Sequence, residues 1–195
     1  MYRVLRLAAL SLAVFFGLLG CVPTTVTGQK FAAIDEPIGQ LAIYVLEAKF
    51  ERPYDTLELK KTEVSGNVDV EKFFPHLARR LPLVFSFNGI ESKSVLSMAG
   101  KGFSTNYQYA LTVVPQRVSW SSRRDTSLDV SCQIMNVKTQ VKIWVGKISL
   151  ETVGTGKYDE KIADVFAVKL LNKLRDDGIL KLRAAEAQVL PPTSM

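Results

Sequence analysis

Histidine and cysteine are nearly absent from this chain. Its 195 residues include one histidine, His76, and two cysteines, Cys21 and Cys132. Metal sites need several converging His, Cys or carboxylate ligands, and nucleophilic catalysis needs a nucleophile, a base and an orienting group. His76 falls within a predicted helix and Cys132 on the apolar side of a predicted strand, where packing is the expected role of the thiol. We therefore expect no enzyme activity, no metal and no cofactor.

Acidic side chains are missing from the first 20 residues. Arg3 and Arg6 give a basic start, residues 7–19 are almost wholly apolar, and Gly20 comes directly before Cys21. This order is typical of a secretory signal peptide. The 13-residue apolar run is shorter than the ~20 residues that a membrane-spanning helix needs. The sequence predicts that residues 1–20 are a signal peptide.

The segment Leu18-Leu19-Gly20-Cys21 resembles the end of a bacterial lipoprotein signal. The resemblance implies that Cys21 receives a diacylglycerol thioether and becomes the first residue of the mature protein. Two or more acyl chains hold a protein firmly on a membrane. Val22, rather than an aspartate, follows the cysteine, and in Gram-negative lipoproteins this usually accompanies transport to the outer membrane. For a Gram-negative host we therefore expect an outer-membrane lipoprotein that faces the periplasm. An ordinary signal peptide with a chance cysteine, or a short membrane anchor, are the alternatives.

The charge balance of the mature chain is mild. Without residues 1–20 it has 23 Lys and Arg against 19 Asp and Glu, which gives 23 − 19 = +4. A dispersed charge of this size does not favour a nucleic-acid partner. A lipid on Cys21 would leave Cys132 without an intramolecular partner, so burial rather than a disulfide is expected to stabilise the fold.

Composition divides the mature chain into three parts. Residues 21–39 are rich in Pro, Thr and Gly, which predicts a lipidated N-terminus and a tether. Residues 40–182 carry the periodic apolar patterns of one folded domain. Residues 183–195 contain Pro191-Pro192 and predict a flexible tail.

Period-two alternation at Leu128, Val130, Cys132 and Ile134 predicts a half-buried strand. The predicted strands are 41–50, 56–64, 83–87, 107–120, 128–134 and 141–150, with a bulge or an edge position at Pro115 and a bulge at Gly146. The predicted helices are Asp69–Leu81, which Pro82 ends, a brief helix over 91–99, and Asp159–Asp177, with Gly178 as its C-cap. Together they predict an α+β two-layer sandwich, with one mixed, mainly antiparallel sheet and the two principal helices on one face.

Two stretches resemble a class of small bacterial outer-membrane lipoproteins. Residues 41–46 (LAIYVL) match the position of their first core strand, and Val137–Trp144 is similar to their V-K-T-G-x-x-x-W hairpin, with Gln140 in place of the glycine. Asp177-Gly178 after the closing helix also fits. The class contains the lipoprotein activators of penicillin-binding proteins and the N-terminal part of the curli secretion lipoprotein.

The resemblance implies a non-catalytic, lipid-anchored periplasmic adaptor or assembly factor for a cell-envelope machine. Its expected partners are the membrane, through lipid on Cys21, and an envelope protein, with the oligomeric state unknown. The alternative is a lipid- or small-molecule-binding auxiliary lipoprotein of an envelope transporter. That function would need an apolar cavity between the sheet and the helices.

One group of side chains is a candidate binding patch for an anionic ligand. It consists of Arg117, Trp120, Arg123 and Arg124. Guanidinium groups beside an aromatic ring can bind carboxylates, phosphates or sugar rings. The alternative is a solvated hairpin end with Trp120 buried.

Overall fold

The structure is a computed structural model that describes residues 24–47, 70–98, 106–120, 126–152, 158–184 and 187–188. Several predictions fall outside these ranges. They are the signal peptide, the lipid site Cys21, the strand over 56–64, and Arg123 and Arg124.

Six strands and two long helices make up the described part of the chain. Their bounds are β1 (Thr24–Lys30), β2 (Gln40–Glu47), α2 (Val70–Phe87), β3 (Glu91–Met98), β4 (Tyr109–Trp120), β5 (Thr126–Asn136), β6 (Lys142–Thr152) and α3 (Glu160–Asp176).

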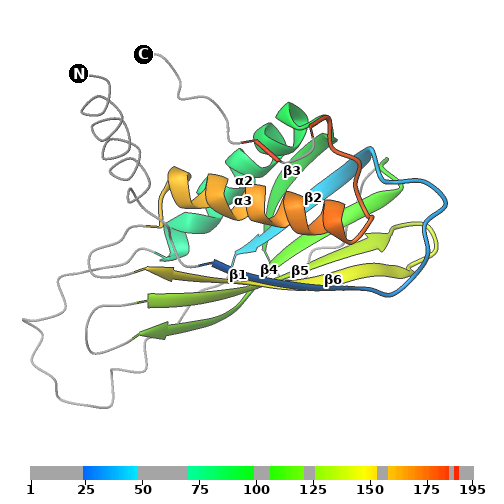
Figure 1. Ribbon diagram of the computed structural model, residues 1–195. Helices are drawn as coiled ribbons and strands as arrows, with labels where there is room; N and C mark the ends of the chain where they lie inside the picture. The colour runs from blue at the N-terminus through cyan, green and yellow to red at the C-terminus, as the bar shows by residue number, and fades with distance from the viewer. Residues whose placement is uncertain are drawn as a thin grey trace, which may run out of the picture.

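The strands form one sheet in the order β1-β6-β5-β4-β2-β3. Strand β2 runs parallel to β3 and β4, whereas the pairs β1–β6, β5–β6 and β4–β5 are antiparallel. Helix α2 packs over β2 and β3, and α3 packs over β1 and β6. Figure 1 shows both helices on the same face of the sheet. The predicted two-layer α+β sandwich with a mixed sheet is confirmed.

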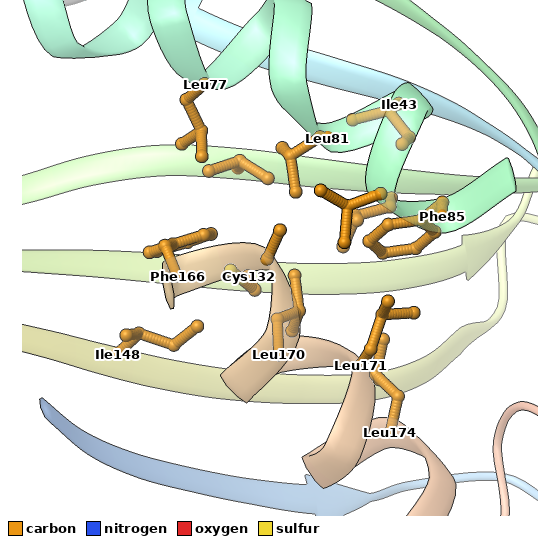
Figure 2. Close-up of a cluster of buried hydrophobic side chains, with 14 of the residues drawn as sticks. Ile43, Leu77, Leu81, Phe85, Cys132, Ile148, Phe166, Leu170, Leu171 and Leu174 are labelled. Atoms are coloured by element: carbon orange, nitrogen blue, oxygen red, sulfur yellow. The ribbon is translucent and has the colours of Figure 1, made fainter. Parts of the chain in front are cut away.

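The core lies between this face of the sheet and the helices. Leu128, Val130, Cys132 and Ile134 of β5 are fully buried, as their alternation predicts. Figure 2 shows leucine and phenylalanine side chains of α2 and α3 converging on the Cys132 side of the sheet. Burial raises the pKa of the Cys132 thiol far above its ordinary value, so the thiol is unreactive and serves packing.

Helix α2 is longer than predicted. The prediction that Pro82 ends it and that residues 83–87 form a strand is wrong, because the helix continues to Phe87 with Pro75 and Pro82 inside it. Val84 and Phe85 are fully buried, as are Leu77 and Leu81. Their three- and four-residue spacing extends one apolar helical stripe. Burial of that stripe outweighs the backbone hydrogen bonds that the prolines cannot make.

The brief helix predicted over residues 91–99 is also wrong. Residues Glu91–Met98 form β3, which pairs with β2 in parallel from Gln40↔Glu91 to Glu47↔Met98. Hydrogen bonds to β2 therefore override the local preference of this segment.

The bulge predicted at Pro115 is confirmed, because the β4–β5 register shifts between Pro115 and Arg117. The bulge predicted at Gly146 is wrong. In the β5–β6 pair, Ile134 faces Trp144 and Met135 faces Lys142, so Ile143 is the extra residue. The change of alternation in β6 therefore starts at Ile143, before Gly146.

The segment predicted to be a tether contains part of the sheet. Thr24–Lys30 form β1 and pair with β6 from Thr24↔Leu150 to Lys30↔Trp144. Further along, Ile38 is buried and its N–H donates to the carbonyl of Ile179 at 2.9 Å. The Thr, Pro and Gly composition that suggested an extended linker is thus compatible with a strand at the edge of a sheet.

The tail is held at residues 187–188. The side chain of Asn88 donates to the carbonyl of Gln188 at 3.0 Å and accepts from its N–H at 2.8 Å. The N–H of Ala187 donates to Asn172 at 2.8 Å. These two tail residues are therefore attached to Asn88, directly after α2, and to Asn172 of α3, whereas residues 189–195 of the predicted flexible tail lie outside the described residues.

Candidate functional site

The face of the sheet opposite the helices carries the polar side chains of β1, β5 and β6. On β5 they alternate with the buried core residues, so Asp129, Ser131 and Gln133 point away from the helices. Lys147 and Ser149 do the same on β6. Further along this face, at β2 and β4, a small apolar cluster forms around Ala42, Tyr44 and Ala110, with Tyr107, Met135 and Val137 packed against it. The β1–β6–β5 part is thus the polar part of this face; Figure 1 shows these three strands side by side.

A shallow hollow of about 520 Å³ lies on this polar part. It spans strands β1, β6, β5 and the bulge of β4, and its lining consists of Thr27, Gly28, Gln29, Gln116, Asp129, Ser131, Val145, Gly146 and Lys147. Six of its nine lining residues carry side-chain donors or acceptors. A hollow of this character suits hydrogen-bonded contact with a protein or another polar surface more than burial of an apolar ligand.

Asp129 is the charged centre of the hollow. Its carboxylate accepts from the ammonium of Lys147 at 2.7 Å and from the hydroxyl of Ser149 at 2.6 Å. Burial alone would raise the pKa of Asp129, but the bonds from Lys147 and Ser149 and the charge of Arg117 together hold it below its ordinary value. The carboxylate therefore stays ionised as a fixed acceptor, and Lys147, whose side chain is 53% exposed, adds a donor that a partner can reach.

A tryptophan supports the hollow from the helix side. Gly28 and Gly146 pair across β1 and β6, and the indole of Trp144 lies against both. A Cβ at Gly28 would come within 2.4 Å of the indole, and one at Gly146 within 2.2 Å. The indole N–H donates to Asp177 at 2.6 Å, and Asp177 also accepts from Lys173 at 2.7 Å. Asp177, directly after α3, thus holds the indole in place, and the indole leaves no room for a side chain at Gly28 or Gly146.

The predicted anionic-ligand patch is described only in part. Arg117 is exposed on β4 and lies opposite Asp129 in the β4–β5 register. Trp120 is the last residue of β4 and pairs with Thr126, while Arg123 and Arg124 lie outside the described residues. Of the four residues, the structure therefore places only Arg117 beside the hollow, next to a carboxylate that the patch prediction did not include.

The residues that the prediction missed had a visible signal. Asp129, Ser131, Lys147 and Ser149 occupy the polar positions of two strands whose apolar positions were recognised. Sequence alone does not show that β1 pairs with β6, a contact between residues more than 100 positions apart. That pairing contributes Thr27 and Gln29 to the hollow.

His76 lies on α2, with its ring 3.7 Å from the carboxylate of Glu160 on α3. Its ring is within 2.9 Å of the Arg79 guanidinium, which is paired with Glu160. The imidazole is thus part of a surface ion-pair cluster joining α2 to α3. Among the described residues, no group of three or more His, Cys, Asp or Glu side chains is placed to hold a metal ion.

The space between sheet and helices is occupied by side chains. The ring of Phe73, for example, contacts those of Phe74, Tyr158 and Phe166 in edge-on geometry, with 5.4–6.2 Å between ring centres. The hollow described above lies on the other face of the sheet. In the described part of the chain, neither helix combines the length and apolar content that crossing a membrane requires.

Comparison with known proteins gives no family. No family model matches the chain, and no curated protein matches it. Among solved structures, the fold is similar to PelC from Paraburkholderia phytofirmans, described as a dodecamer, and to a point variant of it. The TM-score is 0.47 for both, with 14% and 13% identity, over 83% of this chain and 100% of theirs. At this level the likeness assigns neither family nor function.

Proposed function

We propose that this protein is a lipid-anchored, non-catalytic adaptor or assembly factor of a bacterial cell envelope, and that it binds an envelope protein through the open polar face of its sheet. The lipobox-like segment ending at Cys21 supports the anchor. The hollow around Asp129 supports the binding face, and it is the observation on which the proposal rests.

The binding face combines rigidity with unused hydrogen-bonding capacity. The strands beneath the hollow are held by antiparallel ladders, which run without a register shift along β1–β6 and from Thr126 to Ile134 in β5–β6, and Trp144 and α3 support them from the other side. Gln29, Gln116 and Lys147 extend donors from this fixed surface around an ionised Asp129. Preorganised polar groups of this kind favour specific protein contact, since little side-chain order is lost on binding.

Site-specific photo-crosslinking in cells tests the binding face. A photoreactive amino acid replaces Gln116 at the hollow, or Lys169 on the exposed side of α3 as the matched control. We expect one adduct of defined mass from position 116, and its loss when Ser131→Arg fills the hollow. Adducts only from position 169, or a position-116 adduct unaffected by Ser131→Arg, would contradict the proposed face.

The anchor is tested separately. Cells grown with labelled palmitate should label the wild-type protein and leave Cys21→Ser unlabelled, and the serine variant should leave the membrane fraction.

Native mass spectrometry of the purified mature domain addresses the alternative function, a lipid- or small-molecule-binding lipoprotein. A stoichiometric lipid retained apart from the Cys21 modification would favour a carrier over an adaptor.

A further inference from the structure

The distance between the proposed lipid site and the sheet is very short. Only Val22 and Pro23 separate Cys21 from Thr24, the first residue of β1. Three residue steps of extended chain span at most about 10–11 Å. We infer that the lipid holds one end of the sheet, where Thr24, Trp120, Thr126 and Thr152 lie, close to the bilayer surface. This inference rests on the proposed lipidation of Cys21.

Strand β1 transmits this constraint because it is fixed to the domain along its length. All seven of its residues pair with β6, and Val26 packs against the core. Gly28 lies against the indole of Trp144. Beyond the strand, the N–H of Phe31 donates to the carbonyl of Ile143 at 2.8 Å. The attachment point at Thr24 therefore moves with the sheet.

The strand register defines which end of the sheet is close to the membrane. Thr24 pairs with Leu150 of β6, Thr126 of β5 pairs with Thr152 two residues further, and Trp120 of β4 pairs with Thr126. These residues span three interstrand spacings, or about 14 Å. The proposed membrane-facing surface is thus the short end of four adjacent strands.

The opposite end of the sheet points away from the bilayer. The turn between β5 and β6, at residues 137–140, lies at that end. Strand β5 runs from Thr126 to Asn136, and ten residue steps of antiparallel strand are about 34 Å long. The described sheet therefore stays within roughly 50 Å of the lipid headgroups, and so must the part of the partner that contacts the hollow.

Fluorescence quenching in lipid vesicles tests this orientation. Full-length lipidated protein is reconstituted into phosphatidylethanolamine–phosphatidylglycerol vesicles that carry a nitroxide on the headgroup. A maleimide fluorophore is attached at Glu151→Cys, near the proposed membrane-facing end, or at Thr139→Cys, in the opposite turn. Both positions are exposed, and the buried Cys132 does not compete for the label.

We expect strong quenching at position 151 and none above background at position 139. A Gly/Ser spacer of about 20 residues, inserted between Pro23 and Thr24, adds a mean reach of about 25 Å and should abolish the quenching at 151. Equal quenching at both positions, or quenching at 151 that survives the spacer, would overturn the inferred orientation. Absence of lipid on Cys21 would overturn the proposed anchor and this inference with it.

Discussion

Gln140 holds a backbone conformation that glycine adopts more readily. Its φ is 57°, in the left-handed region, at the glycine position of the V-K-T-G-x-x-x-W pattern. That conformation costs a non-glycine residue about 1–2 kcal/mol, and the bond from its side chain to the carbonyl of Val137 at 2.6 Å offsets part of it. We expect Gln140→Gly to raise the free energy of unfolding by about 0.5–1 kcal/mol.

Urea denaturation of the mature domain measures this change. Thr139→Gly is the matched control, since Thr139 lies in the same turn without a positive φ. It should be neutral or destabilising. A loss of stability in Gln140→Gly would show that the side-chain bond matters more than the backbone strain.

Gly28 has no room for a side chain. A Cβ there would lie 2.4 Å from the indole of Trp144, whereas nothing lies within 4 Å of a Cβ built at Gly39. Forcing a methyl group into a packed core costs about 1–3 kcal/mol or more. Gly28→Ala should therefore lower the unfolding free energy by at least that amount, while Gly39→Ala leaves it nearly unchanged.

The ionised state of Asp129 makes a small, pH-dependent contribution to stability. Because its pKa is lowered in the folded protein, this contribution is present at neutral pH and is lost as the pH falls through the ordinary carboxyl pKa of about 4 and below. Because Lys147 is half exposed, its ion pair with Asp129 contributes at most about 1 kcal/mol to the free energy of unfolding. Lys147→Met should narrow the difference in unfolding free energy between pH 7 and pH 3, as measured by chemical denaturation.

At the scale of elements, a largely buried ion pair joins the two helices, beside the exposed pair of Arg79 and Glu160. Both oxygens of Asp164 on α3 accept from the guanidinium of Arg80 on α2, at 2.7 and 2.6 Å. The two side chains are only 16% and 11% exposed. The hydrogen bond to Asp164 raises the pKa of Arg80 above its ordinary value.

Removal of Arg80 would leave Asp164 buried without its counter-ion. Arg80→Ala is expected to lower the unfolding free energy by about 3 kcal/mol. Arg79→Ala, which removes an exposed pair on the neighbouring residue, should cost less than about 1 kcal/mol. Thermal denaturation of the two variants gives the comparison, and equal effects would rule out a special role for the buried pair.

The elements that could be predicted from the sequence are those with a long, unambiguous period. The alternation in β5 and the capped helix α3, with Asp159 accepting from the N–H groups of Lys161 and Ile162, are examples. Residues 83–87 were wrongly predicted as a strand, because their four apolar residues fit a buried strand as well as the end of a helix. Only contact with the rest of the core decides between them.

The candidate site was less predictable than the fold. The polar positions of β5 and β6 are visible in the sequence, but the hollow exists because β1 joins β6 and the chain bulges after Pro115. Local patterns carry no information about which distant strands become neighbours. The sequence therefore predicted a binding patch at the arginines near Trp120. Of these arginines, the structure describes only Arg117, which lies beside the hollow.

At the scale of the whole molecule, the two ends of the described chain are secured by different means. β1 is attached through a strand ladder, and the tail is attached through Asn88, which is 2% exposed. The side chain of Asn88 bonds both the N–H and the carbonyl of Gln188 and donates to the carbonyl of Val84 at 2.8 Å. The side chain of Asn88 therefore bonds the backbone of the tail in the way that a neighbouring strand would.

Asn88→Ala should release the tail and lower the unfolding free energy by about 1–3 kcal/mol, because buried backbone groups lose their partners. Limited proteolysis should then cut the chain after residue 184 more rapidly than in the wild-type protein. Gln188→Ala is the control, since Gln188 contributes only backbone atoms to these bonds. Equal cleavage rates in Asn88→Ala and Gln188→Ala would contradict this role of Asn88.

The placement of β1 also matters for the handling of the protein. A recombinant fragment trimmed to the domain boundaries expected from composition, residues 40–182, would lack this strand. The hydrogen-bonding groups of β6 would then face solvent as an open template, with the Trp144 ring uncovered beside them. Such an edge invites pairing between molecules and precipitation, so a soluble preparation should retain the chain from Thr24 onward.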